Sequence, residues 1–144
     1  MTFPSQMGGI ALAGALSLSL ACSSQSPEAK LVDAARPALS WVATLRMTGE
    51  QWIANSVPKS FVQSTVAAAR DDLGKTVDDV AKSTARATVR LPLQRLLHEA
   101  RTEGFGLRKA VEAGDRAAAA RQVEQLKALQ LQLAAWQRQA AGPS

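Results

Sequence analysis

The sequence predicts an all-α protein, an antiparallel up-down-up-down four-helix bundle that follows a cleaved signal peptide. The composition favours helices, because alanine, leucine, glutamine and arginine dominate and tyrosine is absent. Apolar residues recur at steps of three and four in four successive segments, as on the buried face of an amphipathic helix. Short connections containing proline or glycine separate these segments, which is typical of antiparallel neighbours. We therefore expect one domain over residues 28–140.

The N-terminus carries an apolar run from Ile10 to Ala21, directly before the only cysteine, Cys22. This run is well short of the ~20 residues that a membrane-spanning helix needs, but it has the length of a signal-peptide core. Ser19 and Ala21 provide the small residues that a signal peptidase requires just before its cleavage point. Residues 1–21 are therefore expected to be a signal peptide, and the chain is expected to be exported.

This N-terminal stretch resembles the signal of a bacterial lipoprotein. The resemblance implies that Cys22 carries acyl chains, among them palmitate, and becomes the first residue of the mature chain. Lipidation would also consume a thiol that has no partner for an internal disulfide. Residues 22–27 would then be the acylated cysteine and a polar tether, with the body close to the periplasmic side of the outer membrane, a location with which Ser23 is compatible. The alternative is secretion into the periplasm or beyond after cleavage at the same bond, because no basic residue precedes Lys30.

The first helix is predicted to start after Ser26, which can cap it, with Pro27 at its first position and an acid, Glu28, in its first turn. Pro37 removes a backbone donor and predicts a break or kink. The apolar and small residues of this segment lie along one face: Leu31, Ala35, Ala38, Val42, Leu45, Gly49 and Trp52.

The second helix is predicted from about Ser60, after the proline-containing connector 55–59, and extends as far as Arg90. Gly74 lies inside it and favours a local bend. The chain is expected to turn at Leu91, because a residue before proline disfavours the helical region. Its inner face comprises Val62, Val66, Ala69, Leu73, Thr76 and Val80.

The third helix is predicted to begin at Pro92 and the fourth to run from about Arg116 to Ala140. Gly104 and Gly106 predict a bend in the third helix, the alternative being close approach of a neighbouring helix or a ligand. Between these helices, residues 113–115 supply a glycine stop followed by an aspartate cap. Residues 141–144 are expected to be a disordered tail.

Three aromatic residues are candidate contacts for a ligand or partner. Trp41 and Trp52 project within about 20° of each other on one helix. They fit either a binding stripe or the buried edge of a bundle helix, the commoner role of large aromatics. Phe105, between its two glycines, could join them around a pocket between the helices.

The formal net charge is +5, and the excess of basic residues lies in the second half of the chain. Such a surface favours anionic partners, namely phospholipid headgroups, envelope polymers or acidic proteins, and Arg86 and Arg90 are the candidate contacts. No nucleic-acid-binding motif occurs, and we expect no nucleic acid partner. Ordinary solvated helix faces, with pairs such as Arg95 and Glu99, explain such charges more commonly.

Catalytic and cofactor chemistry has few candidate residues. His98 and Cys22 are the only residues of their types, so a multi-histidine metal site or a Cys/His pair cannot be built within one chain. Met47 and His98 could serve as axial haem ligands, but a methionine and a histidine on separate helices are far more often structural. The acidic residues of the second helix are spaced as an exposed face, without a pocket that would raise a carboxyl pKa: Asp71, Asp72, Asp78 and Asp79. We therefore expect no enzyme and no cofactor.

Two function classes follow from these patterns. The first is a non-catalytic, exported helical lipoprotein that acts as an envelope adaptor or binding module through a helix face. The second is a binder of a small ligand or a haem-like cofactor, with a pocket between the helices. The first predicts a packed core and a surface patch, and the second predicts an internal cavity. The sequence does not indicate an oligomeric state.

Overall fold

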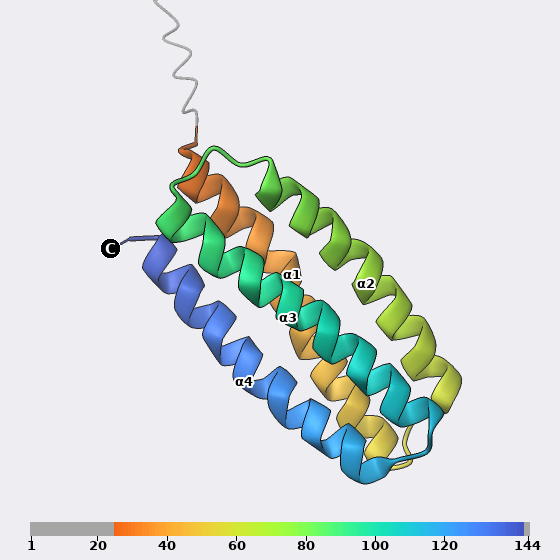
Figure 1. Ribbon diagram of the computed structural model, residues 1–144. Helices are drawn as coiled ribbons and strands as arrows, with labels where there is room; N and C mark the ends of the chain where they lie inside the picture. The colour runs from red at the N-terminus through yellow and green to blue at the C-terminus, as the bar shows by residue number, and fades with distance from the viewer. Residues whose placement is uncertain (1–24, 143–144) are drawn as a thin grey trace, which may run out of the picture.

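A computed structural model describes residues 25–142, which form four α-helices and contain no strand (Figure 1). This confirms the predicted all-α class. The helices are α1 (Pro27–Ile53), α2 (Lys59–Ala81), α3 (Ala87–Glu112) and α4 (Arg116–Ala140). The predicted signal peptide and Cys22 lie outside the described residues.

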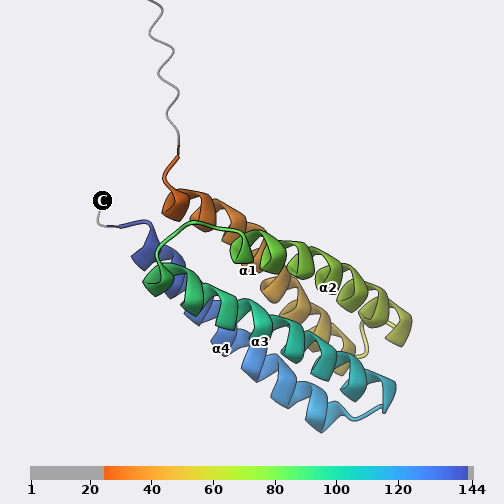
Figure 2. The ribbon, with the colours of Figure 1, turned by 45° about the horizontal axis from the view of Figure 1, so that its top comes forward.

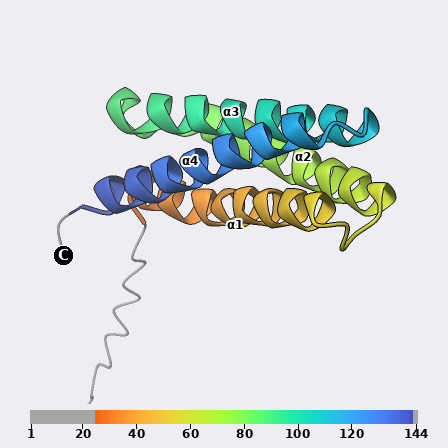
Figure 3. The same cartoon turned by 90° about the horizontal axis from the view of Figure 1, so that it is seen from below.

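The four helices lie side by side as rods, and the start of α1 and the end of α4 are at the same end (Figure 2). α1 contacts all three other helices, and α3 contacts α2 and α4, whereas α2 and α4 do not touch one another within residues 25–142. Seen from below, α1 and α3 form the two outer layers (Figure 3).

The start of α1 is as predicted, because the Ser26 side chain accepts a hydrogen bond from the backbone N–H of Ala29 at 3.1 Å. Of the break or kink predicted at Pro37, the break is absent, since α1 continues through this residue. Pro37 deprives only the Asp33 carbonyl of its helical donor, and both residues are exposed, so water can reach that carbonyl.

The boundary between α2 and α3 differs from the prediction. α2 ends at Ala81 rather than near Arg90, and the chain crosses to α3 over residues 82–86. This crossing is held by Ser83, whose hydroxyl accepts from the N–H of Ala85 at 3.1 Å and whose carbonyl accepts from Nη1 of Arg90 at 3.0 Å. The predicted turn at Leu91 is therefore wrong.

Pro92 lies in the second turn of α3 instead of starting it. There it removes a single helical donor, that to the Thr88 carbonyl. A contact from the far end of the chain supports this turn, since the Trp136 indole Nε1 donates to the Val89 carbonyl at 2.9 Å.

The predicted connection between α3 and α4 is confirmed. Gly114 has a φ of +66°, the left-handed conformation that glycine adopts most readily, and the Asp115 carboxylate accepts from the N–H of Ala118 at 2.9 Å. At the end of α4, Ala141 and Gly142 donate backbone hydrogen bonds into the last turn. These two residues of the predicted tail are thus hydrogen-bonded to the last turn of α4, while residues 143–144 lie outside the described range.

Within residues 25–142, the buried core cluster runs from Leu31 to Trp136 and draws on all four helices. Glycines allow the helices to approach closely. A Cβ on Gly104 would lie 3.3 Å from Cδ1 of Leu45, and one on Gly106 would lie 2.7 Å from Cδ of Gln122. α3 runs uninterrupted through both, so close approach of neighbouring helices, the alternative to a bend, explains these glycines. The largest fully buried side chains are Leu45, Leu73, Leu93, Leu97, Leu107, Leu126, Leu133, Val42, Val62, Val80 and Val111.

Candidate functional site

An open groove of about 530 Å³ lies between α2 and α3. Its floor is apolar and includes Leu45 of α1, which is reached between the two helices. Small residues at Ala69, Ala100 and Gly104 leave space for the groove above this floor, whose side chains are themselves buried. We call this hollow the cationic groove, and its polar and aromatic lining comprises Arg70, Asp71, His98, Arg101, Thr102, Phe105 and Arg108.

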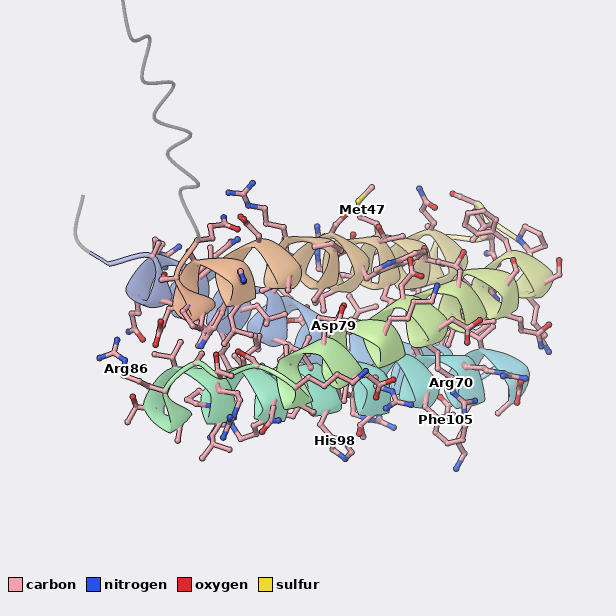
Figure 4. All side chains as sticks on the ribbon, turned by 90° about the horizontal axis from the view of Figure 1, so that it is seen from above. Met47, Arg70, Asp79, Arg86, His98 and Phe105 are labelled. Atoms are coloured by element: carbon pink, nitrogen blue, oxygen red, sulfur yellow. The ribbon has the colours of Figure 1, made fainter. Side chains whose placement is uncertain are left out.

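Three guanidinium groups and one carboxylate line the cationic groove. Arg108 is paired with Glu112 at 2.8 Å, whereas Arg70 and Arg101 form no ion pair within residues 25–142. Arg70 from α2 and Phe105 from α3 lie near one another (Figure 4). Guanidinium groups that are not neutralised present planar donors that suit carboxylate or phosphate groups.

Phe105 is the apolar feature at the rim of the groove. Its side chain is 54% exposed, although phenylalanine is usually buried. The Lys109 ammonium lies 5.7 Å from the ring centroid, within the range of a cation–π contact. An exposed aromatic ring among cations can therefore contact an apolar group while its neighbours bind an anion.

The two tryptophans do not line this groove. Trp41 is half-buried and its Nε1 donates to Oδ2 of Asp72 at 3.0 Å, which ties α1 to α2. Trp52 is buried, and the Arg116 guanidinium lies 5.2 Å from its ring centroid. The structure thus separates Phe105 from Trp41 and Trp52, and the expected pocket around all three is not formed by the described residues.

Arg86 and Arg90 lie at the start of α3, away from Phe105, and Arg86 is beside the start of α1 (Figure 4). The backbone N–H of Arg86 donates to the carboxylate of Glu28 and lowers the pKa of that carboxyl, and the Arg86 Nε lies 3.2 Å from the same oxygen. Arg90 is committed to the Ser83 carbonyl. Both residues therefore stabilise the α2–α3 connection, and neither lines the cationic groove with Phe105.

Met47 and His98 point away from opposite sides of the bundle (Figure 4). They therefore cannot ligate one haem iron within a single chain, which argues against the haem alternative for this pair. Among residues 25–142, no group of three or more His, Cys, Asp or Glu side chains is placed to hold a metal ion. The acidic face of α2 is exposed as expected, except for Asp72, which is half-buried beside Trp41.

Glu103 is half-buried on the other flank of α3. Burial raises the pKa of its carboxyl, and the neighbouring Glu99 raises it further. It does not line the cationic groove. On α4, the side-chain Oε1 of Gln122 is buried and accepts no hydrogen bond within residues 25–142.

Sequence reasoning missed the arginines of the cationic groove, Arg70, Arg101 and Arg108. A local signal was present on α3, because Arg101, Phe105 and Arg108 follow the helical spacing of four and three beside the small residues Ala100 and Gly104. The contribution of Arg70 depends on how α2 is aligned with α3, which no local pattern encodes.

No protein-family model, no curated protein and no solved structure matches this chain. Within residues 25–142, none of the helices combines the length and apolar character that a membrane crossing requires.

Proposed function

We propose that this protein is an exported, non-catalytic helical-bundle lipoprotein that acts as an adaptor or binding module of the bacterial envelope. Its binding site is the cationic groove, through which it takes up an anionic partner. The observation that carries this proposal is the combination of two arginines without ion-pair partners, Arg70 and Arg101, with an apolar floor and the exposed ring of Phe105.

An open groove supports the adaptor over a small-ligand binder. A ligand-binding site encloses most of its ligand's surface, whereas this groove is open along the seam between α2 and α3. The core beneath it is filled by leucine and valine. Its lining includes Phe105 and three arginines, residue types that are enriched at protein interfaces.

We also infer that the helices form the antiparallel up-down-up-down bundle. The connections at residues 54–58, 82–86 and 113–115 are short, and each pair of consecutive helices is in contact. Short connections between long contacting helices favour antiparallel neighbours. A signal peptide at 1–21 and acylation of Cys22 would then leave the bundle on a short tether at the end where α1 starts.

The anchor is tested by the intact mass of the protein expressed with its own N-terminus in a Gram-negative host and separated into membrane and soluble fractions. A membrane-bound species that starts at Cys22 and carries acyl chains is expected. An unacylated soluble species would leave export without an anchor, and an uncleaved cytoplasmic chain would refute export as well.

The groove is tested by a photo-crosslinking amino acid placed at Phe105 in the same cells. We expect adducts from this position and none from Leu131, an exposed residue of α4 that serves as the matched control. The adducts should disappear when Arg70 and Arg101 are both changed to glutamate. Equal adducts from both positions, or adducts that survive the charge reversal, would contradict the proposed site.

A further inference from the structure

The exposed side of α3 carries a stripe that shares three residues with the cationic groove and extends beyond it at both ends. Its members follow helical steps of four and three over the whole length of α3, so they share one line on its surface. All of them are exposed. We call this line the α3 stripe, and it comprises Leu91, Arg95, His98, Thr102, Phe105 and Lys109.

The α3 stripe contains two large apolar side chains and no acid. Leu91 and Phe105 are each 54% exposed and lie four turns apart, about 21 Å along the helix. The nearest carboxylates of α3, Glu99 and Glu103, are half-buried on the flank away from the groove. Of the two basic residues of the stripe, Arg95 lies 3.8 Å from the Glu99 carboxylate, whereas Lys109 forms no ion pair within residues 25–142. The stripe therefore presents two separate apolar groups with the cation of Lys109 beside Phe105.

We propose that the α3 stripe, with the adjoining Arg101 and Arg70 of the cationic groove, docks on the anionic headgroups of a phospholipid bilayer. This proposal rests on the proposed function and names the partner of its binding face. Phe105 and Leu91 enter the boundary between headgroups and acyl chains, while the arginines and Lys109 bind lipid phosphates.

The spacing of the apolar groups favours a bilayer over an acidic protein helix. A helix docking in a groove needs a continuous row of apolar anchors one turn apart, whereas Leu91 and Phe105 are separated by polar and charged residues. An interfacial helix instead combines apolar insertions with lysine and arginine at headgroup level. Arg101 and Lys109 also form no ion pair within residues 25–142, so they are available to phosphate groups.

The experiment uses the chain from Gln25 to Ser144, because it contains the core seen in residues 25–142 and lacks both the apolar run and Cys22. Binding is measured by co-sedimentation with phosphatidylcholine vesicles that contain about one third phosphatidylglycerol, and with phosphatidylcholine vesicles alone. We expect binding to the anionic vesicles only, and a decrease as salt is raised.

Neutralising Arg101 and Lys109 together to glutamine should weaken the vesicle partition roughly 25-fold, at about fivefold for each cation near an anionic surface. The matched control neutralises Arg121 and Lys127 of α4, which are exposed and form no ion pair within residues 25–142, and so gives the same net charge. The control pair should bind like the parent chain. Equal losses from both pairs would show that only net charge matters and would overturn the proposal.

Insertion is tested with an environment-sensitive dye on a single cysteine, since the chain from Gln25 has no cysteine of its own. The dye emission should shift to the blue on anionic vesicles for Phe105→Cys and Leu91→Cys, but not for Leu131→Cys on α4. Failure of the parent chain to bind these vesicles, or an equal shift at Leu131, would overturn bilayer docking. In that case, arginine-dependent crosslinks from position 105 to a protein or polymer would still support the proposed function. The absence of such crosslinks would refute the proposed function together with bilayer docking.

Discussion

Gly49 of α1 gives a direct test of how the helices pack. It is buried where α1 meets both α3 and α4. A Cβ at this position would lie 2.7 Å from Cγ2 of Val123 and 3.1 Å from Cδ1 of Leu107. The substitution Gly49→Ala therefore adds one methyl group to a contact that has no room for it.

Two opposing effects decide the stability of Gly49→Ala. Replacing glycine by alanine inside a helix favours folding by about 1 kcal/mol. Overpacking a filled core costs about 1–3 kcal/mol, and the upper end applies because Val123 is β-branched, held in one rotamer by its helix and only 5% exposed. The expected net change is a loss of about 2 kcal/mol in the free energy of unfolding.

The matched control is Gly74→Ala, because a Cβ on Gly74 meets nothing within 4 Å. It should gain about 1 kcal/mol from helix propensity alone. Both variants are compared by urea unfolding followed by helical circular dichroism. The double variant Gly49→Ala with Val123→Ala should be less destabilised than the sum of the single variants by at least about 1 kcal/mol. If Gly49→Ala stabilised the protein as much as Gly74→Ala does, the packing of α1 on α3 and α4 would be wrong.

Three further predictions concern single positions. Gly106→Ala should stabilise the protein by about 0.5–1 kcal/mol in urea unfolding, because the new Cβ meets only the flexible end of Gln122 and would push its buried Oε1 toward water. Arg116→Ala should lower the unfolding free energy by about 1–2 kcal/mol, and Arg116→Lys should restore only part of it, because lysine cannot donate to the last carbonyls of α1 and stack on an indole at once. Glu103→Gln should stabilise by about 0.3 kcal/mol at neutral pH, since it removes a half-buried charge beside Glu99. The raised pKa of Glu103 means that the folded state binds this proton more tightly than the unfolded state, so the gain should shrink as pH falls through that pKa and vanish below the unfolded value; a gain that grew on acidification would contradict this assignment.

Helix starts were predictable where their chemistry is local. Ser26 and Asp115 each cap a helix through a hydrogen bond to a backbone N–H three residues on, and each can be identified from neighbouring residues alone. Gly114 likewise marks the end of α3 through its own left-handed conformation. These positions needed no knowledge of tertiary contacts.

The start of α3 was not predictable by the same means. Proline is unfavourable inside a helix because it removes a backbone hydrogen-bond donor. The size of this penalty depends on whether other interactions are lost as well. At Pro92 the adjoining turn gains a hydrogen bond from Trp136 to Val89, which lies far away in the sequence. A local rule that ends a helix before proline cannot include that contact.

The candidate site was predicted only in part for the same reason. Phe105 was identified from its two glycine neighbours, and the cationic character of the second half of the chain from its composition. Arg70 joins Phe105 only because α2 packs against α3 in one particular register. Trp41 and Trp52 project from nearly the same side of α1, yet they contact different helices, because α1 has α2 and α4 as neighbours on its two flanks.

One packing feature, the contact between α1 and α3 across the diagonal of the bundle, explains both the groove and the tight core. α1 contacts α3, whereas α2 and α4 do not touch within residues 25–142. Two glycines make this diagonal short, since Gly49 faces Leu107 and Gly104 faces Leu45. A short diagonal between α1 and α3 brings Leu45 to the floor of the seam between α2 and α3, where only Ala100 and other small residues lie above it. The same glycines that pack the core therefore leave a groove with a buried apolar floor, and the arginines and the exposed ring of Phe105 at its rim suit an anionic amphiphilic surface.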